Sequence, residues 1–217
     1  MLKKVSTLLI ITSFFVLASC SKDNNSQEKT KTQGKEESVT QKSPEKIAPE
    51  DDPTLKGTPV LGFKLRDSTV DSVKKRLNNY KINGESYAGG PVLENDGTGF
   101  DIDGLLFTQF GFDKNQKLVY VWMTVSENNH MSKETYKKIV SYVQKNSYKI
   151  IREKAPFVGD QETVFLTPNN EMITVSAPHM GGFKVNIEYV TQEFEQQRSQ
   201  INQESQQKKN QSEAANF

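Results

Sequence analysis

The residue types that could carry chemistry are concentrated in a glycine-rich stretch near the middle of the chain. Residues 83–104 read NGESYAGGPVLENDGTGFDIDG and hold six of the thirteen glycines. The same stretch carries five carboxylates, which are Glu85, Glu94, Asp96, Asp101 and Asp103. Hard cations such as Ca²⁺ prefer several oxygen ligands on a loop of this kind. The spacing lacks the alternating acidic order and the closing Glu of a calcium loop. We therefore expect a long surface loop or a wide hairpin rather than a metal site.

Candidate nucleophiles and bases are few. Ser86 lies in the run Gly-Glu-Ser-Tyr-Ala, which is close to a nucleophile elbow, but an elbow needs a following helix and Gly-Gly-Pro comes next. His130 and His179 are the only histidines, and neither has a carboxylate or cysteine beside it in the sequence. We expect both to be solvent-exposed or packing residues. The sequence therefore predicts no catalytic residue, no metal ligand and no cofactor.

An aromatic pair is the best candidate for binding. Along residues 118–125 the side chains of Tyr120 and Trp122 share one face of a predicted strand, and Val119, Val121 and Met123 share the other. If helices cover the aliphatic face, Tyr120 and Trp122 point to the open side of the sheet, where rigid aromatics suit binding. The alternative is that the 83–104 insert or a C-terminal helix folds over them.

The N-terminus carries a targeting pattern. Lys3 and Lys4 precede the largely apolar run 5–16, which is too short for a membrane span and fits the apolar region of a signal peptide. The run ends in Leu17-Ala18-Ser19-Cys20, and Cys20 is the only cysteine. This ending resembles the lipobox of bacterial lipoproteins.

The lipobox resemblance implies a lipid anchor. Signal peptidase II would cut between Ser19 and Cys20, and the Cys20 thiol would carry a diacylglyceryl group, with palmitate-type chains holding the protein in the lipid bilayer. The chain would then be extracytoplasmic. Ser21 follows the cysteine, and the absence of Asp there resembles an outer-membrane address if the host is Gram-negative. The alternative is a plain secretory signal peptide with a chance cysteine.

Composition divides the rest of the chain. Residues 1–19 are the predicted signal peptide, and residues 20–57 contain no aromatic side chain and are predicted to be a disordered tether. Every aromatic residue of the mature chain except Phe194 and Phe217 lies in 58–192, the predicted globular domain. Residues 193–217 are a polar, glutamine-rich tail, helical or disordered, with a weak helical stripe at Phe194 and Ile201.

The hydrophobic periods predict elements within 58–192. A strand is expected at 60–65, a helix from Val70 capped by Ser68 or Thr69, and a turn at Asn83-Gly84. A hairpin joins 105–112 to 117–125, and Ser132 is expected to cap a second helix. Further strands are expected near 147–153, 161–167, 171–177 and 183–190, with a turn at 168–170.

A faint internal repeat organises these elements. Residues 78–82 (NNYKI) match residues 146–150 (NSYKI), and each half reads as helix, strand, strand, turn and strand, with about 13 extra residues in the first half. We expect an α+β fold in which one antiparallel sheet, built as a tandem βαββ-type repeat, carries two helices on one face. That architecture resembles the two-layer folds of the β-lactamase-inhibitor proteins and of the small lipoprotein of the outer-membrane barrel-assembly machine. The likeness is architectural and transfers no functional residue.

These observations favour one functional class. A net charge of +1 argues against a nucleic-acid partner. The predicted function is a membrane-anchored lipoprotein of the cell envelope that acts as a non-catalytic protein-binding or scaffold module. The alternatives are an envelope hydrolase or metal-dependent enzyme that uses residues 83–104, and a surface antigen or inhibitor protein.

Overall fold

The protein is described by a computed structural model, which covers residues 56–216. The predicted signal peptide, Ser19, Cys20 and nearly all of the predicted tether lie outside the described residues. The elements in chain order are β1 (Pro59–Val60), β2 (Phe63–Lys64), α1 (Val70–Arg76), β3 (Lys81–Glu85), β4 (Gly89–Asn95), β5 (Leu105–Asp113), β6 (Leu118–Ser126), α2 (Glu134–Gln144), β7 (Lys149–Lys154), β8 (Gln161–Leu166), β9 (Glu171–Ala177), β10 (Lys184–Thr191) and α3 (Gln192–Ala214).

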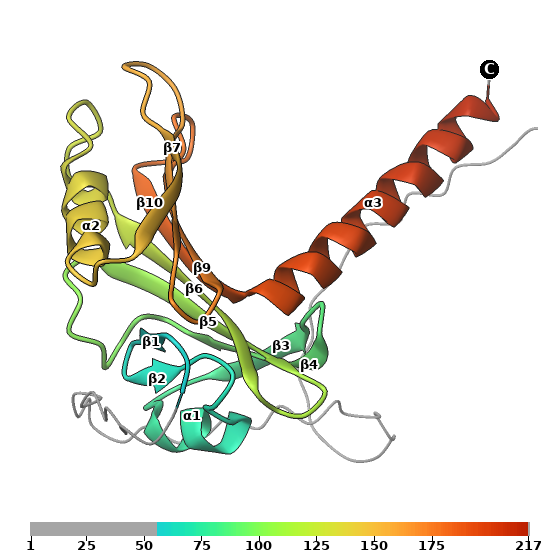
Figure 1. Cartoon of the computed structure of the whole chain (residues 1–217), viewed down its shortest axis with the longest axis horizontal. Coiled ribbons are helices and arrows are strands. Elements are labelled where there is room, and N and C mark those ends of the chain that lie inside the picture. The colour runs from blue at the N-terminus through green and yellow to red at the C-terminus, as the bar shows by residue number, and fades with distance from the viewer. Residues whose placement is uncertain (1–55, 217) are drawn as a thin grey trace, which may run out of the picture. The chain divides into compact units, whose positions relative to one another are not determined.

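One large antiparallel sheet forms the centre of the fold. Its eight strands run in the order β3-β4-β5-β6-β10-β9-β8-β7, while β1 and β2 pair only with each other (Figure 1). Strands β3 to β6 each pair with the next strand in the chain, and so do strands β7 to β10. The two groups join in the middle of the sheet, where β6 pairs with β10. The predicted α+β class with an antiparallel sheet is confirmed.

The two halves of the sheet have the same plan. In each half one helix precedes a four-stranded meander, α1 before β3 to β6 and α2 before β7 to β10. Strands β5 and β9 start 66 positions apart (105 to 171), and so do β6 and β10 (118 to 184). The four strands predicted after the second helix are confirmed, but the repeat plan of three strands per half was wrong. The supposed extra residues of the first half contain β4, which is the counterpart of β8.

The larger core lies on the face that α1 and α2 cover. Val73 of α1 and Tyr136 and Val143 of α2 pack onto side chains that alternate along the central strands. The fully buried sheet residues of this cluster include Leu93, Phe110, Phe112, Leu118, Val121, Phe165, Ile173, Val175 and Val185. The expectation of two helices on one face is therefore confirmed.

The opposite face carries a second core cluster beneath α3. Val92, Tyr120, Val190 and Phe194 are buried together there, with Trp122 packed against them. Val119 also belongs to this cluster, which corrects its predicted place with Val121. The reason is a bulge: Gly111 pairs with Tyr120 and Phe112 with Leu118, so the intervening residue has no partner and the alternation slips by one.

The predicted strand at 60–65 is a tight hairpin instead. Leu61 and Gly62 both have positive φ, at 54° and 76°, and they join β1 to β2. Two positive values at the centre of a two-residue turn are typical of hairpins. The expected helix cap is confirmed at Thr69, whose side chain accepts a hydrogen bond from the backbone N–H of Ser72 at 3.2 Å.

Helix α2 is capped from a distance rather than by Ser132. The N-cap residue is Lys133, which makes no side-chain cap. The carboxylate of Glu127, at the end of β6, accepts hydrogen bonds from the backbone N–H groups of Thr135 and Tyr136, both at 3.1 Å. Glu127 also accepts one from Asn129. These bonds satisfy the free N–H groups of the first helical turn, so Ser132 is not needed as a cap.

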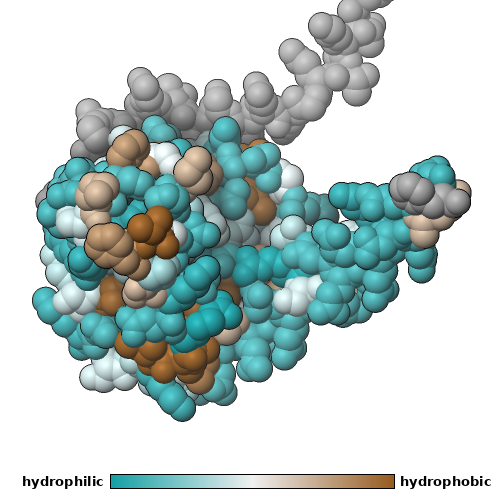
Figure 2. All heavy atoms as spheres, turned by 90° about the horizontal axis from the view of Figure 1, so that it is seen from above, coloured by the Kyte–Doolittle hydropathy of each residue, from teal (hydrophilic) through white to brown (hydrophobic). Residues whose placement is uncertain are grey.

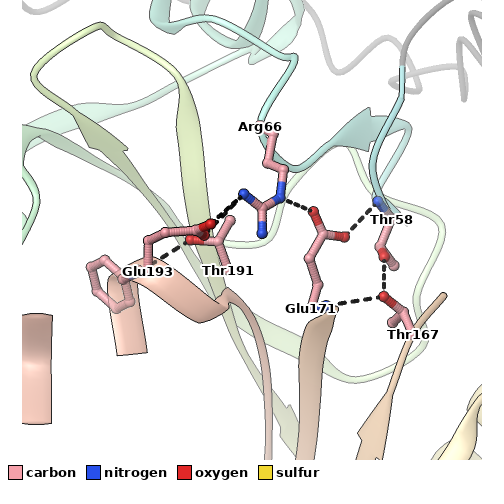
Figure 3. A network of polar contacts seen from close by, with 7 residues as sticks. Thr58, Arg66, Thr167, Glu171, Thr191 and Glu193 are labelled. Carbon is pink, nitrogen blue, oxygen red and sulfur yellow. Dashed lines mark hydrogen bonds and ion pairs between the residues drawn. The ribbon is translucent and has the colours of Figure 1, made fainter. Parts of the chain in front are cut away.

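A buried polar network ties the first loop to the second half of the sheet (Figure 3). Glu171 of β9 is fully buried, and its carboxylate accepts hydrogen bonds from the Thr58 backbone at 2.7 Å and from Nε of Arg66 at 3.1 Å. Arg66 also pairs with Glu193 of α3 at 2.9 Å. The hydrogen bond and charge of Glu193 raise the pKa of Arg66, and those of Arg66 lower the pKa of Glu193. The start of α3 is thereby fixed to the fold.

Helix α3 includes most of the predicted tail. Thr191 caps it by accepting a hydrogen bond from the backbone N–H of Phe194 at 3.3 Å. Phe194 is 2% exposed, whereas every described residue from Ile201 onward is exposed. The first turns of the tail therefore belong to the folded unit, and the rest of the helix extends beyond it.

Candidate binding groove

The structure places the two candidate binding residues on the face opposite α1 and α2, as predicted, but that face is not open at Tyr120. The Tyr120 ring stacks on Phe194 of α3, with centroids 4.8 Å apart and planes 25° apart. Only 8% of Tyr120 is exposed, and its hydroxyl donates to Oε1 of Gln109. Burial, with the nearby charge of Glu188, raises the pKa of Tyr120. Tyr120 is thus a core residue, because the C-terminal helix folds over it.

A glycine makes room for the Tyr120 ring. Gly111 lies beside Tyr120 on β5, and any Cβ at this position would collide with ring carbons of Tyr120. A glycine in a strand interior often marks such a close approach. The pair fixes the ring flat over the strand, where Phe194 can stack on it.

Trp122 remains partly accessible. It follows Tyr120 by two residues on β6, and its indole Nε1 donates to the Thr124 hydroxyl at 3.2 Å. Thr124 in turn donates to Asn186 on β10 at 3.1 Å. These bonds fix the orientation of the indole, which forms part of the floor of a groove.

The groove runs between the β3–β4 turn and α3 and has a volume of about 790 Å³. Tyr87, which is 48% exposed, stands on the wall formed by the β3–β4 turn, and Ile201, which is 40% exposed, stands on the helical wall. The lining residues are Asn83, Glu85, Ser86, Tyr87, Ala88, Gly89, Val92, Gln109, Lys114, Tyr120, Trp122, Glu188, Phe194, Gln197, Arg198, Gln200, Ile201 and Glu204. We refer to this feature as the Trp122 groove.

An ion pair fixes the helical wall. Arg198 of α3 donates both terminal nitrogens to the carboxylate of Glu188 on β10, one of them at 3.1 Å, and it also bonds Glu195. Burial alone would lower the pKa of Arg198, but these carboxylates raise it above its usual value. The guanidinium lies 5.6 Å from the ring centroid of Phe194. Two-pronged pairing of this kind holds a guanidinium in one orientation.

The carboxylates of residues 83–104 are not gathered into one site. Glu94 accepts hydrogen bonds from Asn83 at 2.7 Å and Gln109 at 2.9 Å, and it pairs with Lys81 at 3.2 Å. Burial would raise the pKa of Glu94, but these donors hold it below its usual value. These donors therefore favour the ionised form of Glu94.

The other insert carboxylates lie apart from Glu94. Asp96 bonds Asn79 and Thr98, Glu85 lines the Trp122 groove, and Asp101 and Asp103 line a separate hollow beside α2. Within residues 56–216 no group of three or more His, Cys, Asp or Glu residues is placed to hold a metal ion.

The insert is a strand pair, and Ser86 has a structural place in it. Asn83-Gly84, predicted as the turn, lies within β3 at an irregularity of its pairing with β4. The turn comes three residues later, where the Ser86 hydroxyl donates to the carbonyl of Phe112 and accepts from the backbone of Ala88 at 3.1 Å. Neither histidine lines the groove.

Sequence reasoning missed three residues of this site. No sequence pattern identifies Glu188 or Tyr87 as a binding residue, and Arg198 lies in the segment predicted to be a polar tail. The one usable signal was the spacing of Phe194 and Ile201, which predicted a helix but not the surface that it covers.

The comparisons with known proteins return no match: no family model, no curated protein and no solved structure matches the chain. Among the described residues, no helix is both long enough and apolar enough to cross a membrane.

Proposed function

We propose that this chain is a lipid-anchored, non-catalytic binding module of the cell envelope, and that it holds a segment of a partner protein in the Trp122 groove. The observation that carries the proposal is the composition of that groove. Tyr87, Trp122 and Arg198 line it together, and Tyr, Trp and Arg are the residue types enriched at the energetic centres of protein interfaces.

The rigidity of the groove supports binding. Trp122 lies on a central strand and is oriented by Thr124, while Arg198 is held by two carboxylates. A partner that docks onto residues already fixed in place loses less conformational entropy than one that must order them. A volume of about 790 Å³ is also within the range of ligand sites, roughly 300–1,000 Å³.

The state of the polar groups favours binding over catalysis. The carboxylates Glu94 and Glu188 are engaged by donors and cations, and the Ser86 hydroxyl donates to a backbone carbonyl. General acid–base work needs a group that can exchange a proton with a substrate. The hydrogen bonds and ion pairs of these groups hold the surrounding strands and α3 in place, so we favour the binding module over an envelope hydrolase.

The membrane anchor rests on the lipobox alone. Acylation of Cys20 would leave a mature chain that begins with the lipidated cysteine, and the 37 residues of 21–57 would join it to the domain as a tether. The root-mean-square reach of such a tether is roughly 35 Å. The groove would then meet a partner protein near the surface of the membrane that holds the anchor.

Affinity capture tests the proposal. The mature chain is immobilised through its C-terminus and exposed to detergent-solubilised envelope proteins, in parallel with Tyr87→Ala and with Tyr142→Ala as the matched control. Tyr142 lies on α2, away from the groove, and its 52% exposure is close to that of Tyr87. We expect one partner to be retained by the native chain and by Tyr142→Ala and to be lost from Tyr87→Ala. Equal capture by all three chains would refute the groove as the site.

A further inference from the structure

Three loops meet at one end of the sheet, on the side from which Figure 2 is seen. They are the β6–α2 loop (127–133), the β7–β8 loop (155–160) and the β9–β10 loop (178–183). The backbone N–H of Glu127 donates to the carbonyl of Phe183 at 2.7 Å, and that of His179 donates to Asp160 at 2.7 Å. The loops are therefore held to one another by hydrogen bonds.

This junction brings together the only two histidines of the chain. His130 and His179 are 49 positions apart in the sequence, yet their rings lie near each other, with centroids 5.9 Å apart and planes 28° apart. Each histidine is followed by a methionine. Met131 is 90% exposed and Met180 is 91% exposed. The fold thus joins two His-Met dipeptides that no sequence spacing connects.

Exposed methionines at both positions call for an explanation. A thioether side chain is ordinarily a filler of apolar cores, as Met123 and Met172 are here. Met131 and Met180 instead stand in solvent, each next in the chain to one of the two histidines, and hydrophobic residues gather among hydrophilic ones on the face seen in Figure 2. A role as ligands would account for two exposed thioethers next to two imidazoles.

We propose that His130, Met131, His179 and Met180 form a binding site for a soft monovalent metal ion, Cu(I). Soft thioether ligands select Cu(I), and imidazole is a good ligand for copper. An imidazole nitrogen lies about 2 Å from its metal, so two rings that share one ion have centroids roughly 5–6 Å apart. The observed centroid separation of 5.9 Å falls in that range, and rotation of the two side chains would turn one nitrogen of each ring toward a shared ion.

Lys133 sets the affinity of this site. Its Nζ lies 3.3 Å from Nδ1 of His130, and because an ammonium only donates, Nδ1 accepts this hydrogen bond. A metal ion must compete with Lys133 for the His130 ring, and the two positive charges repel each other. Removing the ammonium is therefore expected to strengthen binding.

The test is a Cu(I) titration of the full-length chain carrying Cys20→Ala, so that no thiol competes for the ion. Cu(I) is supplied anaerobically with a chromophoric bidentate chelator as competitor, and Ag(I) serves as a redox-inert probe of the methionine methyl resonances. We expect one equivalent to bind and the methyl signals of Met131 and Met180 to shift. Affinity should fall about tenfold or more in the double variant Met131→Leu/Met180→Leu and in His179→Gln.

Two further variants complete the experiment. Met172→Leu, a change in the second core cluster, should leave the affinity unchanged, and Lys133→Ala should increase it. Because Met131 and Met180 are exposed, their substitution does not threaten the fold. The proposal is overturned if the double leucine variant binds Cu(I) as tightly as its parent, or if the parent shows no binding in competition with the chelator.

Discussion

Phe194 decides whether α3 is part of the folded unit, and its replacement by alanine gives the most quantitative test of the fold. The side chain is 2% exposed and contacts three groups. Its ring stacks on Tyr120, meets the Tyr87 ring edge-on at a centroid distance of 6.1 Å, and lies beneath the Arg198 guanidinium. Phe194→Ala removes all three contacts and leaves a cavity on the second face of the sheet.

The size of the effect follows from burial. Deleting a buried Phe side chain costs about 3–5 kcal/mol, which includes both the transfer of the ring and the cavity left behind. With a urea m-value of about 1–3 kcal/mol per molar, the unfolding midpoint should fall by roughly 1–5 M. Ile201→Ala is the control. Ile201 is 40% exposed, so its truncation should cost about 1 kcal/mol or less.

Equilibrium urea unfolding, followed by circular dichroism, measures both variants. The loss of Phe194 should also make Trp122 more accessible to iodide, because both residues belong to the second core cluster. If Phe194→Ala lowers the free energy of unfolding by less than about 1 kcal/mol, α3 is not docked and the Trp122 groove has no helical wall.

Limited trypsin digestion gives a second check of whether α3 is docked. Apart from the lysines of the predicted tether, cleavage is expected first at Lys208 and Lys209, on the exposed part of α3, while Arg198 is protected by its ion pairs.

Three further predictions concern the anchor, the aromatic pair and the cap of α2. Cys20→Ala should abolish incorporation of a fatty-acid probe and release the chain from the membrane fraction, and continued labelling of the variant would contradict the lipoprotein prediction. Tyr120→Ala should destabilise the domain by about 3–5 kcal/mol, because the ring is buried, and Trp122→Ala should cost clearly less, because that residue is only partly buried. Equal costs in urea unfolding would show that Trp122 is also core. Glu127→Gln should destabilise by about 1–2 kcal/mol at neutral pH through the loss of a charged cap. Burial would raise the pKa of Glu127, but its backbone donors hold it below its usual value, so the carboxylate stabilises the fold above its unfolded pKa of about 4.3. The deficit of the Gln variant should therefore shrink as the pH falls from about 5 to 3, and a deficit that does not change with pH would contradict the assignment.

Local signals predicted one hairpin in each half of the sheet. The turn at 168–170 and the alternation on either side of it correspond to β8 and β9, and the hairpin of 105–125 corresponds to β5 and β6. These elements are recognisable because their turn residues and their side-chain period agree. Thr69 was predictable for the same reason, since a helix cap depends on residues within one turn of it.

Strand β4 was hidden by its own composition. It begins Gly-Gly-Pro, and these residues are depleted in strands. The structure gives the reason for Gly90: a Cβ there would collide with the backbone carbonyls of Phe112 and Asp113 on β5. Pro91 pairs with Glu85 next to an irregularity in the β3–β4 ladder, where a missing N–H is tolerated. Missing β4 led to the wrong strand count in the first half.

The sites could not be predicted because they depend on contacts between distant segments. The Trp122 groove forms only when α3 packs over β6. The ion pair between Arg198 and Glu188 holds the helix there, and no local sequence pattern predicts this pair. Glu127 caps α2 from the position directly after β6, so the prediction of Ser132 as the cap was wrong. His130 and His179 become neighbours only when the β6–α2 and β9–β10 loops meet.

Site-specific photo-cross-linking in intact cells tests the central proposal most directly. A photoreactive residue is placed at Ile201, on the helical wall of the groove, and in a separate chain at Ile151, on the edge strand β7. The two positions have similar exposure, 40% and 47%. We predict a single adduct with one envelope protein from position 201, absent from position 151 and lost when Tyr87→Ala is added. The same adducts from both positions, or an adduct at 201 that survives Tyr87→Ala, would contradict the Trp122 groove as the binding site.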